Sequence, residues 1–149
     1  MTNTQSGQLV VFSIEDQVLG IDLLSVERII WAVEITPMPN APEKIAGVIN
    51  VQGSIIPVLS FREILHLPSK PLATTDRFVI CKLDGKHGAL IVDEIRGIKH
   101  YELQELQEAK EVMSTQNTVR FFLKTDKEII NLLNLESLAP YIDRELPQA

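Results

Sequence analysis

The sequence contains a single cysteine, Cys81, among its 149 residues. A disulfide within the chain is therefore impossible, and a chain of this length can be stabilised by its hydrophobic core without one. A lone cysteine also fits a reducing compartment. Because Cys81 lies inside an apolar, β-branched run, we expect a small buried side chain with no catalytic role.

Long apolar runs and clusters of positive charge are also missing. No stretch approaches the roughly 18 apolar residues that a membrane-spanning helix needs, so the chain is not expected to insert into a membrane. The start, residues 1–7, lacks the basic and apolar regions of a signal peptide, which makes a cytoplasmic location the expectation. The net charge of −6 argues against binding to nucleic acid or to an anionic membrane surface.

Motifs of catalysis and metal binding are absent. The three histidines, His66, His87 and His100, are far apart and show no metal-ligand spacing. No nucleophile elbow, phosphate-binding loop or zinc-protease motif is present. Asp93 closes an apolar strand, where a carboxylate is usually a hydrogen-bond anchor, although a site residue is the alternative. The sequence thus predicts a protein that is not an enzyme and that needs no cofactor or metal.

What the sequence does contain is a series of short apolar runs separated by turn residues. Such spacing favours an all-β fold of small barrels or a sandwich. Helical turns are expected at 23–27, 61–65 and 135–139, and an exposed helix or loop at 102–111. Strands are expected over 9–14, 18–22, 29–33, 45–50, 54–60, 77–83, 88–92, 95–101, 118–124 and 128–134.

The organisation of the chain is predicted from its proline-rich and polar segments. Residues 67–75 hold two prolines and three hydroxyl side chains, so we expect the boundary between two lobes there. Residues 1–7 and 144–149 are expected to be flexible tails. Ile30 and Trp31 are neighbours in an expected strand and face opposite sides, so either both are core or one is an exposed interface anchor.

The segment from Pro39 to Arg62 is the most sharply defined part of the sequence. Pro39 and Pro42 each fix their own φ angle and favour an extended approach. Two apolar runs follow, and the tight link between them ends in Gly53, a residue that tolerates positive φ. This pattern predicts a buried β-hairpin with a polar turn, and no reactive residues lie in it.

Several residues of this segment carry a resemblance to a known family. They are Pro39, Pro42, Gly47, Asn50, Gly53, Pro57 and Arg62, supported by Leu19–Asp22, Gly88–Asp93 and Glu128–Leu133. On these residues the chain resembles, over 8–140, the CheW-type coupling proteins of bacterial chemotaxis. The resemblance implies one CheW-like domain that is all-β with short helices. It would consist of two small SH3-like five-stranded β-barrels packed around a shared core, without a catalytic site.

The resemblance also implies partners. Such a protein would be an adaptor that couples the cytoplasmic tip of a chemoreceptor to the regulatory domain of a CheA-type histidine kinase, as part of a two-component signal-transduction system. Receptor contact would fall in a groove between the lobes, on Val26, Arg28 and Gln52. Kinase contact would use the ends of the barrels.

This chain departs from the family pattern at two of those positions. The usual Asn-Leu-Arg-Gly of the hairpin is Asn50-Val-Gln-Gly53 here, and Arg28 replaces a usual acid. The guanidinium at position 52 is thereby lost, and with it a bidentate donor. An adaptor of a divergent pathway, such as surface motility, is therefore an alternative function. A small-molecule-binding β-barrel is a third, based only on the cleft that two lobes could leave.

Overall fold

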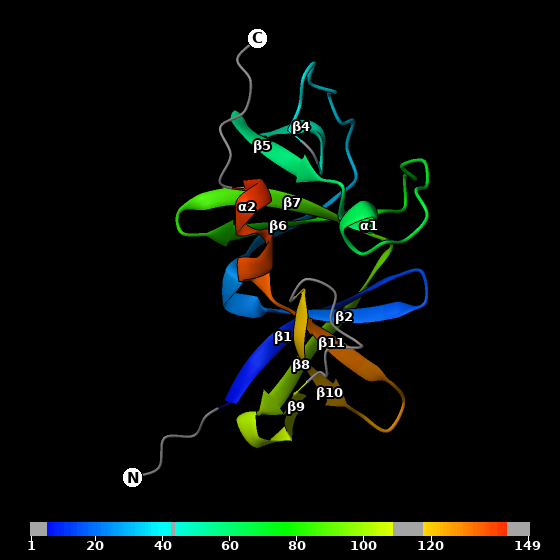
Figure 1. The fold of residues 1–149 in the computed structure, drawn as a ribbon, viewed down its shortest axis with the longest axis vertical. Helices are drawn as coiled ribbons and strands as arrows, with labels where there is room; N and C mark the ends of the chain where they lie inside the picture. Colours follow the sequence, from blue (N-terminus) through cyan, green and yellow to red (C-terminus); the bar gives the residue numbers. More distant parts are fainter. Residues whose placement is uncertain (1–5, 43, 109–117, 143–149) are drawn as a thin grey trace.

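The structure is a computed structural model that describes residues 6–42, 44–108 and 118–142. In these ranges the chain forms two β-sheets and several short helices (Figure 1). The elements, in chain order, are β1 (Ser6–Ile14), β2 (Gln17–Asp22), η1 (Leu23–Ser25), β3 (Val26–Trp31), β4 (Ile45–Val51), β5 (Ser54–Leu59), α1 (Phe61–Ile64), β6 (Arg77–Leu83), β7 (Lys86–Val92), β8 (Glu94–Glu102), η2 (Leu103–Glu105), β9 (Leu106–Glu108), β10 (Val119–Lys124), β11 (Ile129–Leu133), η4 (Leu135–Leu138) and α2 (Ala139–Ile142).

The two sheets are nested in the sequence. One sheet has the strand order β3-β6-β7-β5-β4, and the other has the order β8-β1-β2-β11-β10-β9. All strands of the five-stranded sheet lie between Val26 and Val92, so this sheet interrupts the six-stranded one. Residues 67–75 connect α1 to β6 inside the five-stranded lobe. The lobe boundary expected there is therefore wrong, because the chain changes sheets at η1 and again at Asp93.

The predicted two-lobe, SH3-like, all-β architecture is confirmed, but two of its details differ. One sheet has six strands where five were expected. Among the described strands neither sheet closes into a barrel, because β3 and β4 end one sheet and β8 and β9 end the other. The two lobes lie one above the other in Figure 1, with the five-stranded sheet at the top.

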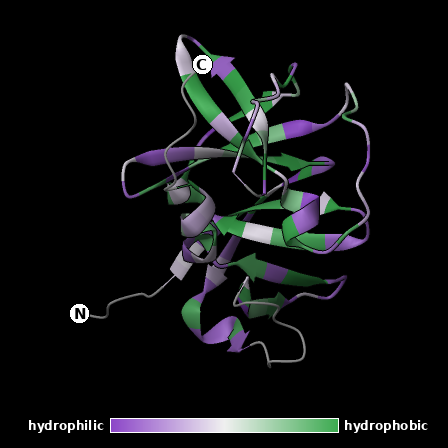
Figure 2. Cartoon of the chain, turned by 45° about the horizontal axis from the view of Figure 1, so that its top comes forward, coloured by the Kyte–Doolittle hydropathy of each residue, from purple (hydrophilic) through white to green (hydrophobic). Residues whose placement is uncertain are grey.

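A single hydrophobic cluster joins the two sheets. It contains Phe12 of β1 and Phe61 of α1, whose ring centroids are 6.3 Å apart with an interplanar angle of 55°. Cys81 of β6 is completely buried in the same cluster, as expected. Figure 2 shows hydrophobic residues along the strands and hydrophilic ones in many of the connecting turns. The shared core predicted from the sequence is thus present.

The last helix, α2, returns from the six-stranded sheet to cover the five-stranded one (Figure 1). Its Ile142 is buried and approaches the backbone of Gly88 in β7. A Cβ atom on Gly88 would lie 2.9 Å from Cγ1 of Ile142, so only glycine allows this approach. Ile142 is itself a member of the shared core cluster, so the C-terminal helix helps to join the two lobes.

Two expectations about secondary structure need correction. The strand expected at 29–33 is β3, which already begins at Val26. The helical turn before it, η1, ends at Ser25, and the Asp22 carboxylate caps that turn by accepting a hydrogen bond from the Leu24 amide (2.9 Å). The helix or loop expected at 102–111 is the end of β8, then η2 and β9. Pairing with β1 and β10 overrides the helix propensity of the glutamates and glutamines. Residues 109–117 lie outside the described ranges, as do 1–5 and 143–149, which include most of the expected tails.

The hairpin between β4 and β5 turns through two residues, Gln52 and Gly53. Val51 pairs with Ser54, and φ is +52° at Gln52 and +90° at Gly53, the signature of a type I′ turn. The Asn50 side chain accepts the Gly53 amide at 2.8 Å and fixes the turn. The positive φ predicted for Gly53 is confirmed.

Replacing Gly53 with valine should lower the free energy of unfolding by about 1–2 kcal/mol. No atom within 4 Å would meet the new Cβ, so the cost comes from the backbone conformation alone. Urea denaturation measures the change. Gly53→Asn is the matched control, because asparagine tolerates positive φ and should cost clearly less. An unchanged midpoint for the valine variant would contradict the turn assignment.

Candidate functional site

Arg28 and Gln52, two of the three residues expected in a receptor groove, lie together. They line a hollow of about 150 Å³ on the five-stranded sheet. We call it the Arg28 groove; its lining residues come from β3 to β7 and are Glu27, Arg28, Val51, Gln52, Ser54, Ile56, Ile80 and His87. All of these residues belong to one sheet or its β4–β5 turn. The groove is therefore a feature of the five-stranded lobe, and it does not lie between the lobes as expected.

Val26 does not line this groove. It is the first residue of β3, it is half-buried, and it packs against the core cluster shared by the two sheets. Its position next to η1 places it where the chain crosses from one sheet to the other. The structure thus brings Arg28 and Gln52 together and separates Val26 from them. A contact role for the three residues stays a prediction.

Of the charged residues in the Arg28 groove, Glu27 has a partner and Arg28 has none within the described ranges. Glu27 Oε2 lies 2.7 Å from His87 Nε2, which links β3 to β7. Arg28 is exposed and has no hydrogen-bond or ion-pair partner within the described ranges. Gln52 and Ser54 add neutral hydrogen-bonding groups, while Ile56 and Ile80 form a buried apolar floor. The groove therefore offers one uncommitted guanidinium and neutral polar groups above a buried apolar floor.

Arg62 and Asp93 form an ion-pair network between the two lobes. Arg62 Nη2 donates to both carboxylate oxygens of Asp93, at 2.9 and 3.0 Å. Arg62 Nη1 donates to the side chain of Glu15, in the β1–β2 turn, and to the carbonyl of Pro68. The Glu15 amide donates to Asp93 at 2.9 Å. Arg62 follows the five-stranded sheet and Glu15 belongs to the six-stranded one, so this network ties the sheets together.

The electrostatics of this network favour its charged form. Partial burial acts to raise the pKa of Asp93, but the Glu15 amide and the Arg62 guanidinium outweigh it, so the pKa lies below its usual value. Burial likewise acts to lower the pKa of Arg62, and hydrogen bonds to Glu15 and Asp93 raise it overall. The reading of Asp93 as a hydrogen-bond anchor is confirmed.

The remaining residues of the family pattern set the backbone around the β4–β5 hairpin. Pro39 and Asn40, with φ of +59° at Asn40, form a turn in which the Ala41 amide donates to the Met38 carbonyl. The Pro42 carbonyl accepts the Ile45 amide, and Pro57 lies opposite Val48 in the ladder. These residues set the path of the backbone into the hairpin, and Gln52 is the side chain at its turn.

Gly47 is required by close packing. Its φ is +154°, and a Cβ there would lie 2.4 Å from the Thr36 carbonyl oxygen. That close approach accompanies the bridge between Thr36 and Val48, which holds the segment before the hairpin against β4. A side chain at this position would push the two segments apart.

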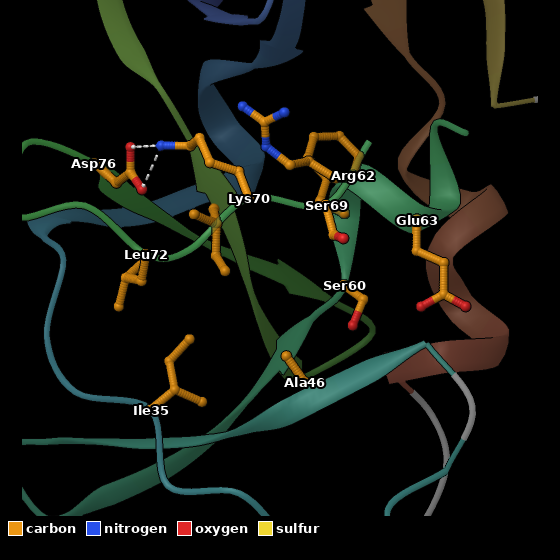
Figure 3. Close-up of a pocket in the computed structure, with 11 residues that line it drawn as sticks. Ile35, Ala46, Ser60, Arg62, Glu63, Ser69, Lys70, Leu72 and Asp76 are labelled. Atoms are coloured by element: carbon orange, nitrogen blue, oxygen red, sulfur yellow. Dashed lines mark hydrogen bonds and ion pairs between the residues drawn. The ribbon is translucent and has the colours of Figure 1, made fainter. Parts of the chain in front are cut away.

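A second hollow, of about 260 Å³, lies beside α1 and the connection from α1 to β6 (Figure 3). Ile35, Leu72 and Ala46 line one part of it, and the Lys70–Asp76 ion pair of 3.2 Å closes another (Figure 3). Its charged residues already have partners: Lys70 and Asp76 pair with each other, Arg62 belongs to the inter-sheet network, and Glu63 pairs with Lys44. Its volume lies below the range of about 300–1,000 Å³ that is usual for small-molecule sites.

The cysteine and the three histidines that were considered for catalysis or metal binding are either buried, next to a glutamate, or exposed. Burial raises the pKa of Cys81 to about 12, so the thiolate is strongly disfavoured. His87 and His100 each lie beside a glutamate, and His66 is exposed. Within the described ranges no cluster of three or more His, Cys, Asp or Glu side chains could hold a metal ion. No described helix is long and apolar enough to cross a bilayer.

Two features of the site were not found from the sequence. The Glu27–His87 pair joins residues 60 positions apart, so spacing gave no signal for it. Trp31 was considered as either core or exposed, and it is 58% exposed, whereas Ile30 packs against the core of the five-stranded sheet. The Arg77 guanidinium carbon lies 3.2 Å from the centroid of the Trp31 ring, which gives this aromatic a fixed position on the surface.

Comparison with known proteins gives a consistent result. A family model described as a CheW-like domain matches residues 8–142. The probable chemotaxis protein CheW of Rhizobium etli is 31% identical over 140 residues, which cover 91% of this chain and 89% of that protein. The chemotaxis protein CheW of Rhizobium meliloti (strain 1021) is 25% identical over 140 residues, covering 93% and 90%.

A solved structure shows the same architecture. The scaffolding protein TtCheW from Thermoanaerobacter tengcongensis superposes with a TM-score of 0.80 at 27% identity, covering 89% of this chain and 87% of that chain. The match of the family model extends over both sheets, from β1 to α2. The chain therefore belongs to the CheW family.

Proposed function

We propose that this protein is a non-enzymatic cytoplasmic adaptor that couples the cytoplasmic tip of a chemoreceptor to the regulatory domain of a CheA-type histidine kinase. The observation that carries the proposal is the CheW-like domain that spans both sheets, with a scaffolding protein as its structural neighbour. An adaptor needs two binding surfaces in a fixed relation. The shared core and the Arg62–Asp93–Glu15 network supply that relation here.

The Arg28 groove is proposed as the receptor-binding surface, together with Val26, which lies two residues before Arg28 on β3. The groove combines an uncommitted cation and neutral polar groups with an apolar floor. That mixture is typical of the rim and core of a transient protein–protein interface. Kinase contact is proposed for the ends of the two sheets, where exposed apolar residues such as Trp31 and Ile98 lie.

Titration against each partner tests the coupling function. We expect the folded protein to bind the isolated kinase regulatory domain and, separately, a helical-hairpin fragment of the receptor tip, each with a Kd in the micromolar range. Isothermal titration calorimetry measures both. The Arg62→Ala variant serves as a comparison, because it should weaken simultaneous binding of the two partners more than binding of either one alone. A folded protein that binds neither partner would contradict the proposal.

A divergent receptor–kinase pathway is the second candidate, favoured by the unpaired Arg28 and the neutral Gln52. In that case Gln52→Arg, which restores the usual residue of the family, should leave binding to a receptor tip from a standard chemotaxis system unchanged. A clear gain in affinity would instead identify the chain as a weakened standard coupler. A small-molecule-binding barrel would have to use a hollow such as the one of about 260 Å³ beside α1.

A further inference from the structure

The charge balance of the Arg28 groove restricts what can bind there. Two of its lining residues can carry positive charge, Arg28 and His87, and one is acidic, Glu27. Glu27 is already paired with His87 at 2.7 Å, whereas Arg28 has no partner within the described residues. The chain as a whole carries a net charge of −6, and this exposed guanidinium without an acidic partner is opposite in sign to that net charge.

The position of Arg28 is fixed by the fold. It lies on β3, an edge strand of its sheet, where Arg28 pairs with Ile80 next to a register shift between Val26 and Arg28. The opposite side of the groove is the type I′ turn, whose Asn50–Gly53 hydrogen bond holds Gln52 in place. A group entering the groove therefore meets Arg28 and Gln52 at backbone positions that the sheet and the turn already fix, without prior ordering of a loop.

The non-polar part of the groove limits the size of the entering group. Ile56 and Ile80 form a floor that is almost fully buried, and the hollow measures about 150 Å³. That space suits one side chain and is too small for a metabolite. A short side chain that ends in a carboxylate would fit this space and place its oxygens against the forked donors of Arg28.

We propose that the protein segment recognised by the Arg28 groove presents a carboxylate side chain, glutamate or aspartate, which forms an ion pair with Arg28. The groove thereby rejects segments that place a lysine or arginine at that point, because a second positive charge would face Arg28. The acidic residue of the groove, Glu27, is already paired with His87 and does not neutralise it. This inference rests on the proposed function in one respect: the segment is taken to belong to the receptor tip.

A charge-reversal experiment tests this pairing. Using the full chain and the receptor-tip fragment, Arg28→Glu should weaken binding about tenfold or more, and Arg28→Lys only about threefold, since lysine keeps the charge and loses the fork. Arg120→Glu is the matched control: it makes the same change in net charge at an exposed position on the six-stranded sheet, and binding should not change. Equal unfolding midpoints confirm that each variant is folded.

The partner supplies the second half of the experiment. Acidic residues of the tip fragment are replaced by lysine one at a time, and one of these variants should restore binding to Arg28→Glu while losing binding to the wild-type chain. Unchanged or stronger binding by Arg28→Glu, with normal binding by the wild type, overturns the carboxylate inference and leaves the adaptor function standing. No binding of the tip fragment or the kinase domain by the wild type overturns the adaptor function, and this inference with it.

Discussion

Replacing Phe12 with alanine should lower the free energy of unfolding by about 4 kcal/mol. Phe12 is completely buried, and its ring packs against Phe61 from the other lobe. Removing the ring therefore leaves a cavity at the junction of the two sheets, where neither sheet can collapse without losing contact with the other. For a chain of this length the melting temperature should fall by roughly 8–16 °C.

The shared core also predicts how the Phe12→Ala variant unfolds. Trp31 is the single tryptophan and lies on the five-stranded sheet, so its fluorescence reports on that sheet, while far-ultraviolet circular dichroism reports on both. The two signals should shift together to lower urea concentration. Phe121→Ala is the control, because that ring is 38% exposed and its loss should cost less than about 1 kcal/mol. A Trp31 transition that stays at the wild-type position would contradict a common core.

Replacing Arg62 with alanine should destabilise the protein by about 2–3 kcal/mol. The Arg62 side chain is only 12% exposed, and its loss leaves the 30% exposed carboxylate of Asp93 with the Glu15 amide as its remaining donor. The exposed part of the network is screened by water, so the cost stays below that of a fully buried pair. Urea denaturation at neutral pH measures it.

The destabilisation by Arg62→Ala should depend on pH. The pKa of Asp93 is lowered in the folded protein, so the stabilisation is complete above the ordinary carboxyl range, about pH 4, and is lost as the pH falls through the lowered value. The difference between wild type and variant should therefore shrink below about pH 4. Arg96→Ala is the control: its ion pairs with Glu94 and Glu128 are exposed, and its loss should cost less than about 1 kcal/mol at any pH.

Local features of the fold could be predicted from the sequence because local residues determine them. The turn at Gln52 and Gly53 and the turn at Asp84 and Gly85 are each bounded by apolar runs, and both hairpins form. For Ile30 and Trp31 the sequence left two alternatives open, and the structure shows the one in which Trp31 is exposed while Ile30 packs against the core. The two-lobe architecture was predicted from the resemblance to the CheW family, and not from local residues alone.

Features that depend on distant residues could not be predicted. Arg62 and Asp93 are 31 positions apart, and Glu15 and Asp93 are 78 apart, so no spacing rule connects them. The helix or loop expected at 102–111 differs for the same reason: over 102–108 the chain forms the end of β8, the short helix η2 and β9, since pairing with β1 extends β8 to Glu102. The groove was expected between the lobes, whereas β3 and the β4–β5 turn bring Arg28 and Gln52 together within one sheet.

The nesting of the sheets has a consequence for how the protein is made. Every strand of the five-stranded sheet has left the ribosome once residue 92 is clear of the exit tunnel, so these strands can pair while synthesis continues, and Leu138 and Ile142 complete the shared core later. The first hairpin, β1–β2, is made earliest, yet it must wait for β8 and β11 before its two edges are covered. During that interval its open edges are available to other nascent chains, which makes the oldest part of the protein the one most exposed to misassembly.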